Sequence, residues 1–250
     1  MKFIYSTEEK CWQTGQSQQL DCCDTLSFGQ KGQTMLGFGG CFNELGIIAL
    51  NKLSEADRAE VFDELFGEEN CGFNYCRLPM GANDFAEIWY SHNETENDFE
   101  MENFSIARDY KYLIPYIREA QKRRGDLQLF ASPWSPPTWL KFPKVYNYGT
   151  LVWEEKYLKA YAKYIRLFLE AYRQENIPIQ AYHIQNEPVA DQKFPSCLWT
   201  GEQYRDFIEN YLAVEFAEHS VDSEIWVGTI NCEHYNQFLG HIMESEACRN

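Results

Sequence analysis

The stretch IPIQAYHIQNEP, residues 177–188, decides the fold. An apolar, strand-like run stops in Asn186 and Glu187, and Pro188 follows at once. It is one of five strand-like runs that alternate with helical patterns from about residue 33; the others are QTMLGFGGCF, CGFNYCRLPM, LQLFASPW and EIWVGTI. Such alternation predicts a parallel sheet with right-handed crossovers.

The segments between these runs have helical patterns. In chain order, the helices are expected at about residues 54–66, 106–117, 157–172 and 200–212, with a last one from about residue 235. Ser54 opens a capping sequence for the first, and Thr200 with Gln203 opens one for the fourth. Pro115 would kink the second helix, whose apolar face includes Ile106 and Tyr110.

Two architectures fit this alternation: a doubly wound open sheet and a (β/α)₈ TIM barrel. A nucleotide-binding sheet usually carries G-x-G-x-x-G after its first strand, and GFGG at residues 37–40 does not match that pattern. Polar and aromatic residues instead follow the strand-like runs, at Asn43, Glu44, Arg77, Trp134, Ser135, Asn186 and Glu187. Barrel enzymes place their sites at that face, so the sequence favours an α/β fold of the TIM-barrel type.

The number of units is smaller than a complete barrel needs. Eight units take about 250 residues, whereas this chain of 250 residues shows five units after residue 33. We therefore expect a partial barrel over residues 33–250. Short strands in residues 1–32, at FIYS and TLSFGQ, would belong to a side β-structure, and the chain would be the N-terminal part of a longer protein.

Composition narrows the class of protein. The formal net charge of −16 disfavours a nucleic-acid partner, and the 44% hydrophobic content supports a sizeable core. There is no run of 18 apolar residues and no signal-like segment at the N-terminus. Nine cysteines without zinc spacing suggest buried free thiols in a reducing compartment, hence the cytoplasm, with disulfides or a metal site as the alternative. The oligomeric state stays open.

Glu187 is the strongest candidate for chemistry. Pro188 disfavours helical geometry in the residue before it, so we expect Glu187 to be extended and its carboxylate to have a defined direction. A carboxyl group there could act as a general acid or base. Asn186 could orient a substrate hydroxyl with both its donor and its acceptor. A solvated or helix-capping glutamate is the alternative.

Three further residues could line a site. Arg77 follows an apolar run and needs a partner, which we expect to be a carboxylate; a structural ion pair is the alternative. Asp84 could accept hydrogen bonds from sugar hydroxyls, or serve the turn in GAND. Trp134 offers a flat ring and an N–H donor that suit a pyranose, whereas core filling is expected for Trp139. His183 is expected to be a core histidine.

Four stretches in order resemble glycoside hydrolase family 30, the glucosylceramidase family of retaining β-glycosidases. They are QTMLGFGGCFNE, YCRLPMGANDF, ASPWSPPTWLK and HIQNEP, and CLWTGEQYRDFIENYL also resembles the family. The resemblance covers about residues 33–240. It implies a (β/α)₈ barrel flanked by a β-sandwich that includes the N-terminal strands, and it implies no metal or organic cofactor.

The resemblance also implies roles for the candidate residues. Glu187 would be the general acid/base, with Asn186 binding the hydroxyl next to the anomeric carbon. Asp84 and Trp134 would bind the glycone, and Arg77 would support the catalytic carboxylates. The family's nucleophile, a glutamate after the seventh barrel strand, has no match here. Retention needs two carboxyl groups about 5–5.5 Å apart, so we expect the chain alone to be inactive.

The substrate and even the activity have alternatives. A β-glucosyl substrate such as glucosylceramide is the family default, and β-1,6-glucan or a β-xyloside would also fit. Asn43 and Glu44 stand where the family usually has Thr-Asp, which bears on the substrate. A non-catalytic sugar-binding relic is a second hypothesis. An unrelated α/β enzyme is a third, and the lack of a phosphate loop or nucleophile elbow weighs against it.

Overall fold

The structure is a computed structural model that describes residues 3–16, 27, 29–231 and 235–249. The chain divides into two compact units, residues 1–35 and 36–250, which are considered separately. In the first unit, β1 (Phe3–Tyr5) pairs antiparallel with β2 (Gln13–Gly15). The strand expected at FIYS is thus confirmed, whereas half of TLSFGQ lies outside the described residues.

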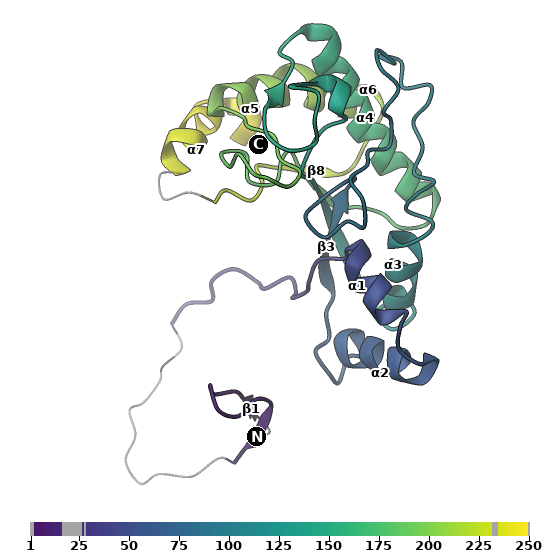
Figure 1. Ribbon diagram of the computed structural model, residues 1–250. Helices are drawn as coiled ribbons and strands as arrows, with labels where there is room; N and C mark the ends of the chain where they lie inside the picture. The colour runs from purple at the N-terminus through teal and green to yellow at the C-terminus, as the bar shows by residue number, and fades with distance from the viewer. Residues whose placement is uncertain (1–2, 17–26, 28, 232–234, 250) are drawn as a thin grey trace. The chain divides into compact units, whose positions relative to one another are not determined.

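A four-stranded parallel sheet forms the centre of the second unit (Figure 1). Its strands lie in chain order: β3 (Tyr75–Met80), β4 (Gln128–Pro133), β7 (Ala181–His183) and β8 (Glu224–Trp226). Parallel neighbours in chain order, with a helical crossover between each pair, are the arrangement of the first part of a TIM barrel. The expected partial barrel is therefore confirmed.

The first expected strand is less regular than the others. Residues 36–42 form a single parallel bridge, between Cys41 and Arg77. Backbone bonds nevertheless run beside β3, because Gly40 O accepts from Arg77 N at 2.9 Å and Arg77 O accepts from Phe42 N at 2.8 Å. The segment lies where the first barrel strand belongs, but it does not form the continuous strand that was expected over residues 33–42.

Two glycines of GFGG explain this close approach. A Cβ on Gly39 would lie 2.0 Å from Tyr75 O, and one on Gly37 would lie 2.1 Å from Asn74 Oδ1. Only glycine lets the backbone come this near to β3. The motif therefore serves packing between two barrel segments.

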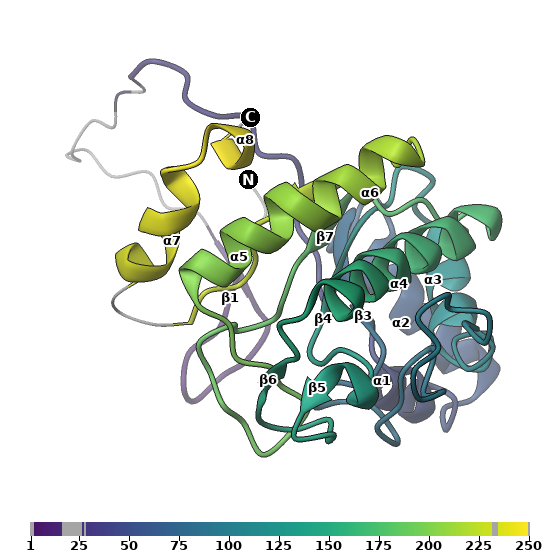
Figure 2. The same cartoon turned by 90° about the horizontal axis from the view of Figure 1, so that it is seen from above.

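Helices cover the outer side of the sheet (Figure 2). The helices of this unit are α1 (Glu44–Leu50), α2 (Glu55–Phe66), α3 (Leu113–Gln121), α4 (Glu155–Gln174), α5 (Gly201–Phe207), the π-helical turn η2 (Ile208–Leu212), α6 (Ala213–Glu218), α7 (Tyr235–Met243) and α8 (Glu246–Arg249). The last two pack against α5 and η2. The two predicted caps are confirmed: Ser54 Oγ accepts from Asp57 N, and Thr200 forms a capping box with Gln203. The caps thus place the starts of α2 and α5 correctly.

The helix expected from residue 106 begins later. Residues 107–112 form turns, and α3 starts at Leu113. Pro115 falls in the first turn, where the helix needs no N–H, so the expected kink is wrong. Tyr110 is exposed rather than part of the apolar face.

One buried carboxylate joins the loop of residues 82–104 to α4. Asp109 is fully buried, and it accepts from Tyr90 Oη at 2.8 Å and from Tyr172 Oη at 2.7 Å. Burial, followed by the charge of Asp109, raises the pKa of both tyrosines well above its usual value, so both remain donors. The loop has no helix or strand of its own, and the bond from Tyr90 to Asp109 holds it to the core.

The other long loop, residues 136–153, is partly ordered. It contains the 3₁₀ turn η1 (Thr138–Leu140) and a hairpin of β5 (Lys141–Phe142) and β6 (Thr150–Leu151). The buried Lys141 Nζ donates to Ser135 Oγ at 2.9 Å, to Tyr146 O at 2.9 Å and to Ser196 O at 2.6 Å. Burial lowers the pKa of Lys141 to about 8. The loops after β4 and β7 are therefore held together by one ammonium group.

The cysteines differ from expectation. The six described cysteines are free, but Cys11, Cys41 and Cys71 are exposed, whereas Cys76 and Cys197 are buried. The expectation of buried thiols is therefore wrong for three of them. Within the described part of the chain, no helix is long and apolar enough to cross a membrane.

The packing of GFGG predicts a contrast between neighbouring glycines. Gly39→Ala should lower the free energy of unfolding by roughly 1–3 kcal/mol, because the new methyl group meets the Tyr75 carbonyl. Gly40→Ala is the matched control, since a Cβ there meets only the Phe73 ring, at 3.9 Å. Urea unfolding followed by circular dichroism measures both. Equal effects would contradict the packing role.

Candidate active site

The inner face of the sheet carries an aromatic layer with polar groups above it. Side chains alternate along strands, so Tyr75 and Arg77 of β3 share one face. Tyr75 stacks near Phe130, with ring centroids 5.8 Å apart, and Trp226 lies 5.6 Å from Phe130. His183 completes the layer at 5.1 Å from Phe130. Nearer the carboxyl ends, Arg77, Asn186 and Glu187 form the candidate site.

Ser132 connects the layer to Arg77. Arg77 Nε donates to Ser132 Oγ at 3.0 Å, and Ser132 Oγ lies 3.0 Å from His183 Nδ1. Ser132 Oγ thus lies between Arg77 and His183 and links the two side chains. Burial, and then the charge of Arg77, lowers the pKa of His183 to about 4, which keeps the ring neutral. His183 is therefore a satisfied core histidine, as expected.

Arg77 binds an amide rather than a carboxylate. Its Nη2 donates to Asn186 Oδ1 at 2.7 Å, and among the described residues no carboxylate lies within ion-pair distance of it. Burial lowers the pKa of Arg77, whereas the charges of Asp84 and Glu187 act in the opposite direction. The expected direct carboxylate partner is thus wrong: a hydroxyl and an amide oxygen satisfy the guanidinium instead.

Asn186 has a fixed orientation as a result. Its Oδ1 also accepts from Thr229 Oγ1 at 3.1 Å, so two donors occupy this oxygen. Its Nδ2 donates to none of the described residues. The sequence suggested that Asn186 offers both a donor and an acceptor, but in the structure only its amide donor is open.

Glu187 has a backbone conformation that the sequence did not indicate. Its φ is +47°, in the left-handed region, so the extended geometry expected from Pro188 is wrong. Its N donates to Thr229 O at 3.1 Å, and its Oε1 accepts from Asn231 Nδ2 at 3.0 Å. A non-glycine residue in this region costs about 1–3 kcal/mol, and such residues cluster at active sites.

The backbone before Glu187 is held from two sides. Gln185 is buried, and its Nε2 donates to Trp134 O at 2.7 Å, which ties the ends of β7 and β4. Gly228 has a φ of +100°, and a Cβ there would lie 2.9 Å from Gln185 O. Glycine thus lets the chain after β8 pass close to the turn that carries Glu187.

Trp134 and Asp84 flank Arg77. The Trp134 ring is 8% exposed, with Arg77 Cζ 4.4 Å from its centroid, so the guanidinium covers one face of the expected sugar platform. The indole N–H has no acceptor in the described part of the chain. Asp84 is exposed, its charge acts on Arg77, and it forms no hydrogen bond or ion pair with the described residues. Two donors and one carboxylate are therefore open around Arg77.

Asn43 and Glu44 have structural tasks instead. Asn43 Oδ1 accepts from Gly46 N at 2.7 Å and caps α1. Glu44 is buried and accepts twice from Arg108, each at 2.9 Å, and from Glu87 N at 2.8 Å. Their position after a strand-like run suggested a place at the mouth; in the structure Asn43 caps α1, and Glu44 holds the 82–104 loop through Glu87 N.

Sequence reasoning missed Ser132, Thr229 and Asn231. The signal for the last two was present, because they follow EIWV as Asn186 and Glu187 follow their own run. Among the described residues, one group is spaced closely enough to hold a metal: Glu215 and Glu218 of α6 with His219, which follows the helix. They lie outside this site, and Glu215 already pairs with Arg166 at 2.6 Å.

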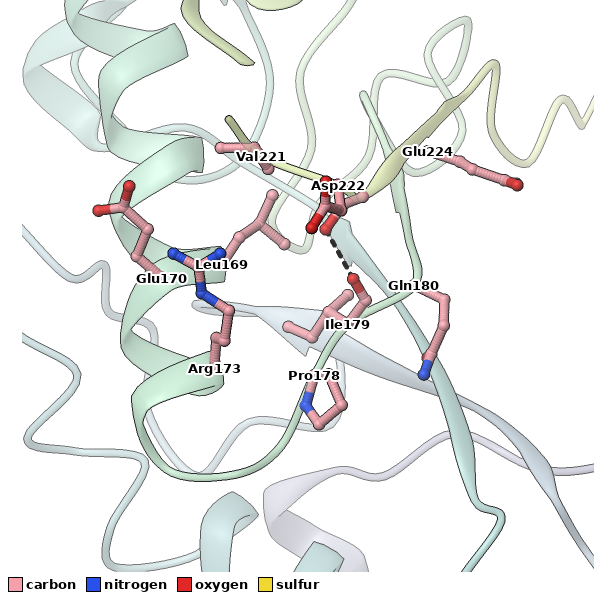
Figure 3. Close-up of a pocket in the computed structure, with 10 residues that line it drawn as sticks. Leu169, Glu170, Arg173, Pro178, Ile179, Gln180, Val221, Asp222 and Glu224 are labelled. Carbon is pink, nitrogen blue, oxygen red and sulfur yellow. Dashed lines mark hydrogen bonds between the residues drawn. The ribbon is translucent and has the colours of Figure 1, made fainter. Parts of the chain in front are cut away.

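A separate cavity of about 340 Å³ lies at the other ends of the strands (Figure 3). It is lined by the end of α4 and by the segments just before β7 and at the start of β8, including Arg173, Ile179 and Asp222. Ser223 Oγ donates to Ile179 O at 2.6 Å across it. None of the candidate site residues line this cavity.

Comparisons with known proteins agree with this geometry. Residues 35–233 match the family model described as the glycosyl hydrolase family 30 TIM-barrel domain. The chain is 34% identical over 209 residues to putative glucosylceramidase 1 of Caenorhabditis elegans, and 33% identical over 210 residues to lysosomal acid glucosylceramidase of Mus musculus. Each alignment covers 80% of this chain.

A solved endo-β1,6-glucanase is also similar. It superposes with a TM-score of 0.80 at 25% sequence identity, over 90% of this chain and 54% of the glucanase chain. The chain spans 40% of the length of the C. elegans relative and 41% of the mouse relative.

The neutral state of His183 predicts an acid-dependent loss of stability. The pKa is near 6.5 in the unfolded chain and about 4 in the folded one, so between these pH values the unfolded chain binds more protons. Stability that is present above pH 6.5 is lost as the pH falls toward 4, by roughly 3 kcal/mol. His183→Gln should lose less between pH 7 and pH 4.5 in urea unfolding. An equal loss in parent and variant would contradict a neutral His183.

Proposed function

The chain belongs to glycosyl hydrolase family 30, and on that premise we propose that the whole protein hydrolyses a β-glycosidic bond with Glu187 as its general acid/base. The observation that carries the proposal is the position of Glu187. It is partly exposed at the carboxyl end of β7, and its carboxylate is held by Asn231 next to Asn186. Barrel enzymes use this end of their strands for catalysis.

The open polar groups suit a sugar. Because Arg77 and Thr229 occupy Asn186 Oδ1, Asn186 can only donate, and it would bind a hydroxyl through the hydroxyl's oxygen. Trp134 Nε1 is a second donor. Asp84 accepts, so it would take the hydrogen of another hydroxyl. Sugar hydroxyls both donate and accept, and this set satisfies both roles.

Glu187 would transfer protons in both halves of the reaction. As the acid, its carboxyl gives a proton to the glycosidic oxygen while that bond breaks. As the base, its carboxylate then takes a proton from the attacking water. Retention also requires a nucleophilic carboxylate about 5–5.5 Å away. We assign that group to the part of the protein that the relatives have and this chain does not span.

A β-glucosyl substrate is favoured. The two relatives are named as glucosylceramidases and the solved structure as an endo-β1,6-glucanase, so a glucosyl group is common to the names. We propose a β-glucoside, with glucosylceramide or β-1,6-glucan as candidates and a β-xyloside as a less favoured one. A sugar-binding protein without activity is the alternative function, since the open donors and Asp84 would also serve binding alone.

Glu187→Gln in the full-length protein tests the proposal. Activity on an alkyl β-glucoside, whose leaving group needs a proton, should fall about 10²-fold or more. The kcat/KM for a dinitrophenyl β-glucoside should fall far less, because this ratio reports only the first half of the reaction, in which that leaving group departs without protonation. Steady-state kinetics on both substrates measure the difference.

Glu202→Gln is the control, since Glu202 lies on α5, outside the site, and is exposed. It should retain the parent's rates on both substrates. If Glu187→Gln equals the parent on the alkyl glucoside, the acid/base role is wrong. If the parent binds β-glucosides in calorimetry and hydrolyses neither substrate, the sugar-binding alternative replaces the proposal.

A further inference from the structure

We propose that Asn231 is a positioning residue for the acid/base carboxylate, and that it acts with Thr229 as a clamp delivered by the segment after β8. The inference rests on the proposed role of Glu187 and extends it to two residues of a neighbouring barrel unit. Thr229 and Asn231 together form this clamp.

The clamp contacts Glu187 at both its backbone and its side chain. Thr229 O accepts from Glu187 N at 3.1 Å, and Asn231 Nδ2 donates to Glu187 Oε1 at 3.0 Å. Thr229 Oγ1 also donates to Asn186 Oδ1 at 3.1 Å, and the two residues form a parallel bridge. The proton donor and its neighbouring amide are thus set by the same short segment.

The backbone of Glu187 needs such support. At a φ of +47° it is in a conformation that costs about 1–3 kcal/mol, and it persists only where the surroundings determine it. The bond from Glu187 N to Thr229 O holds this turn across 42 residues of sequence. Without it, the carboxylate direction would no longer be fixed relative to Asn186.

The chemistry of an amide donor suits a group that must be both acid and base. Because Asn231 occupies Oε1, Oε2 is the oxygen left to carry the proton toward a glycosidic oxygen. A neutral N–H can donate to Oε1 whether Oε2 is protonated or not. A lysine or arginine there would favour the ionised form alone. Asn231 can therefore hold the carboxyl group through both halves of the reaction.

The test uses leaving-group dependence in the full-length protein. Asn231→Ala should lower kcat on an alkyl β-glucoside about 10-fold, the scale of a lost hydrogen bond to a charged group. The loss of kcat/KM on a dinitrophenyl β-glucoside should be less than about 2-fold, because this ratio reports only the first half of the reaction, in which that leaving group departs without a proton. Asn231→Gln keeps an amide donor and should recover part of the loss.

A matched control separates positioning from general effects. Asn210 is an exposed asparagine of η2 whose Nδ2 also donates to a carboxylate, Asp206 Oδ1, at 2.7 Å. Asn210→Ala should keep the parent's rates on both substrates. Equal losses on the two glucosides in Asn231→Ala would indicate a structural role and overturn the inference.

Running Glu187→Gln in parallel distinguishes the two claims. If Glu187→Gln shows leaving-group dependence and Asn231→Ala does not, the clamp is wrong while the acid/base role stands. If neither variant shows it, the role of Glu187 fails and the clamp fails with it. Leaving-group dependence in both, with the smaller effect in Asn231→Ala, supports both.

Discussion

The candidate site depends on one acceptor atom, Oδ1 of Asn186. It accepts from Arg77 of β3 and from Thr229 after β8, so it joins segments from three different barrel units. The bond from the guanidinium is worth about 1.5–3 kcal/mol, more than a neutral bond. Losing the acceptor would also leave part of a half-buried guanidinium without a partner, which is costly. This junction therefore fixes both the amide donor and the backbone that leads to Glu187.

The layers below the junction explain why it can be rigid. Arg77 bonds Ser132, which bonds a neutral His183, and His183 lies in the aromatic layer with Phe130 and Trp226. The Arg77 guanidinium donates to a hydroxyl and to an amide oxygen, so it needs no buried carboxylate as a partner. Asp84 and Glu187, the two carboxylates near Arg77, therefore remain available to a ligand.

Much of this fold follows from local patterns, and the deviations have tertiary causes. Alternation and caps predict the strands and most helices, because those signals act over a few residues. The first strand-like run forms a single bridge to β3 and passes close to it at Gly39, a long-range contact that a local pattern does not indicate. The local preference of a residue before proline is extended, yet Glu187 is left-handed, with its N–H bonded to Thr229 O. The partners of Arg77 lie 55 and 109 residues away, beyond any local rule.

The most direct measurement is a crystal structure of the full-length protein with an unreactive β-glucoside, such as a thioglucoside. The account predicts the glycosidic sulfur in direct contact with Glu187 Oε2, at a hydrogen-bond distance lengthened by the larger sulfur atom. It also predicts that Asn186 Nδ2 donates to the hydroxyl next to the anomeric carbon and that Asn231 stays on Oε1. A sugar bound away from Glu187, or a Glu187 carboxylate that leaves Asn231 to make room for it, would contradict the account.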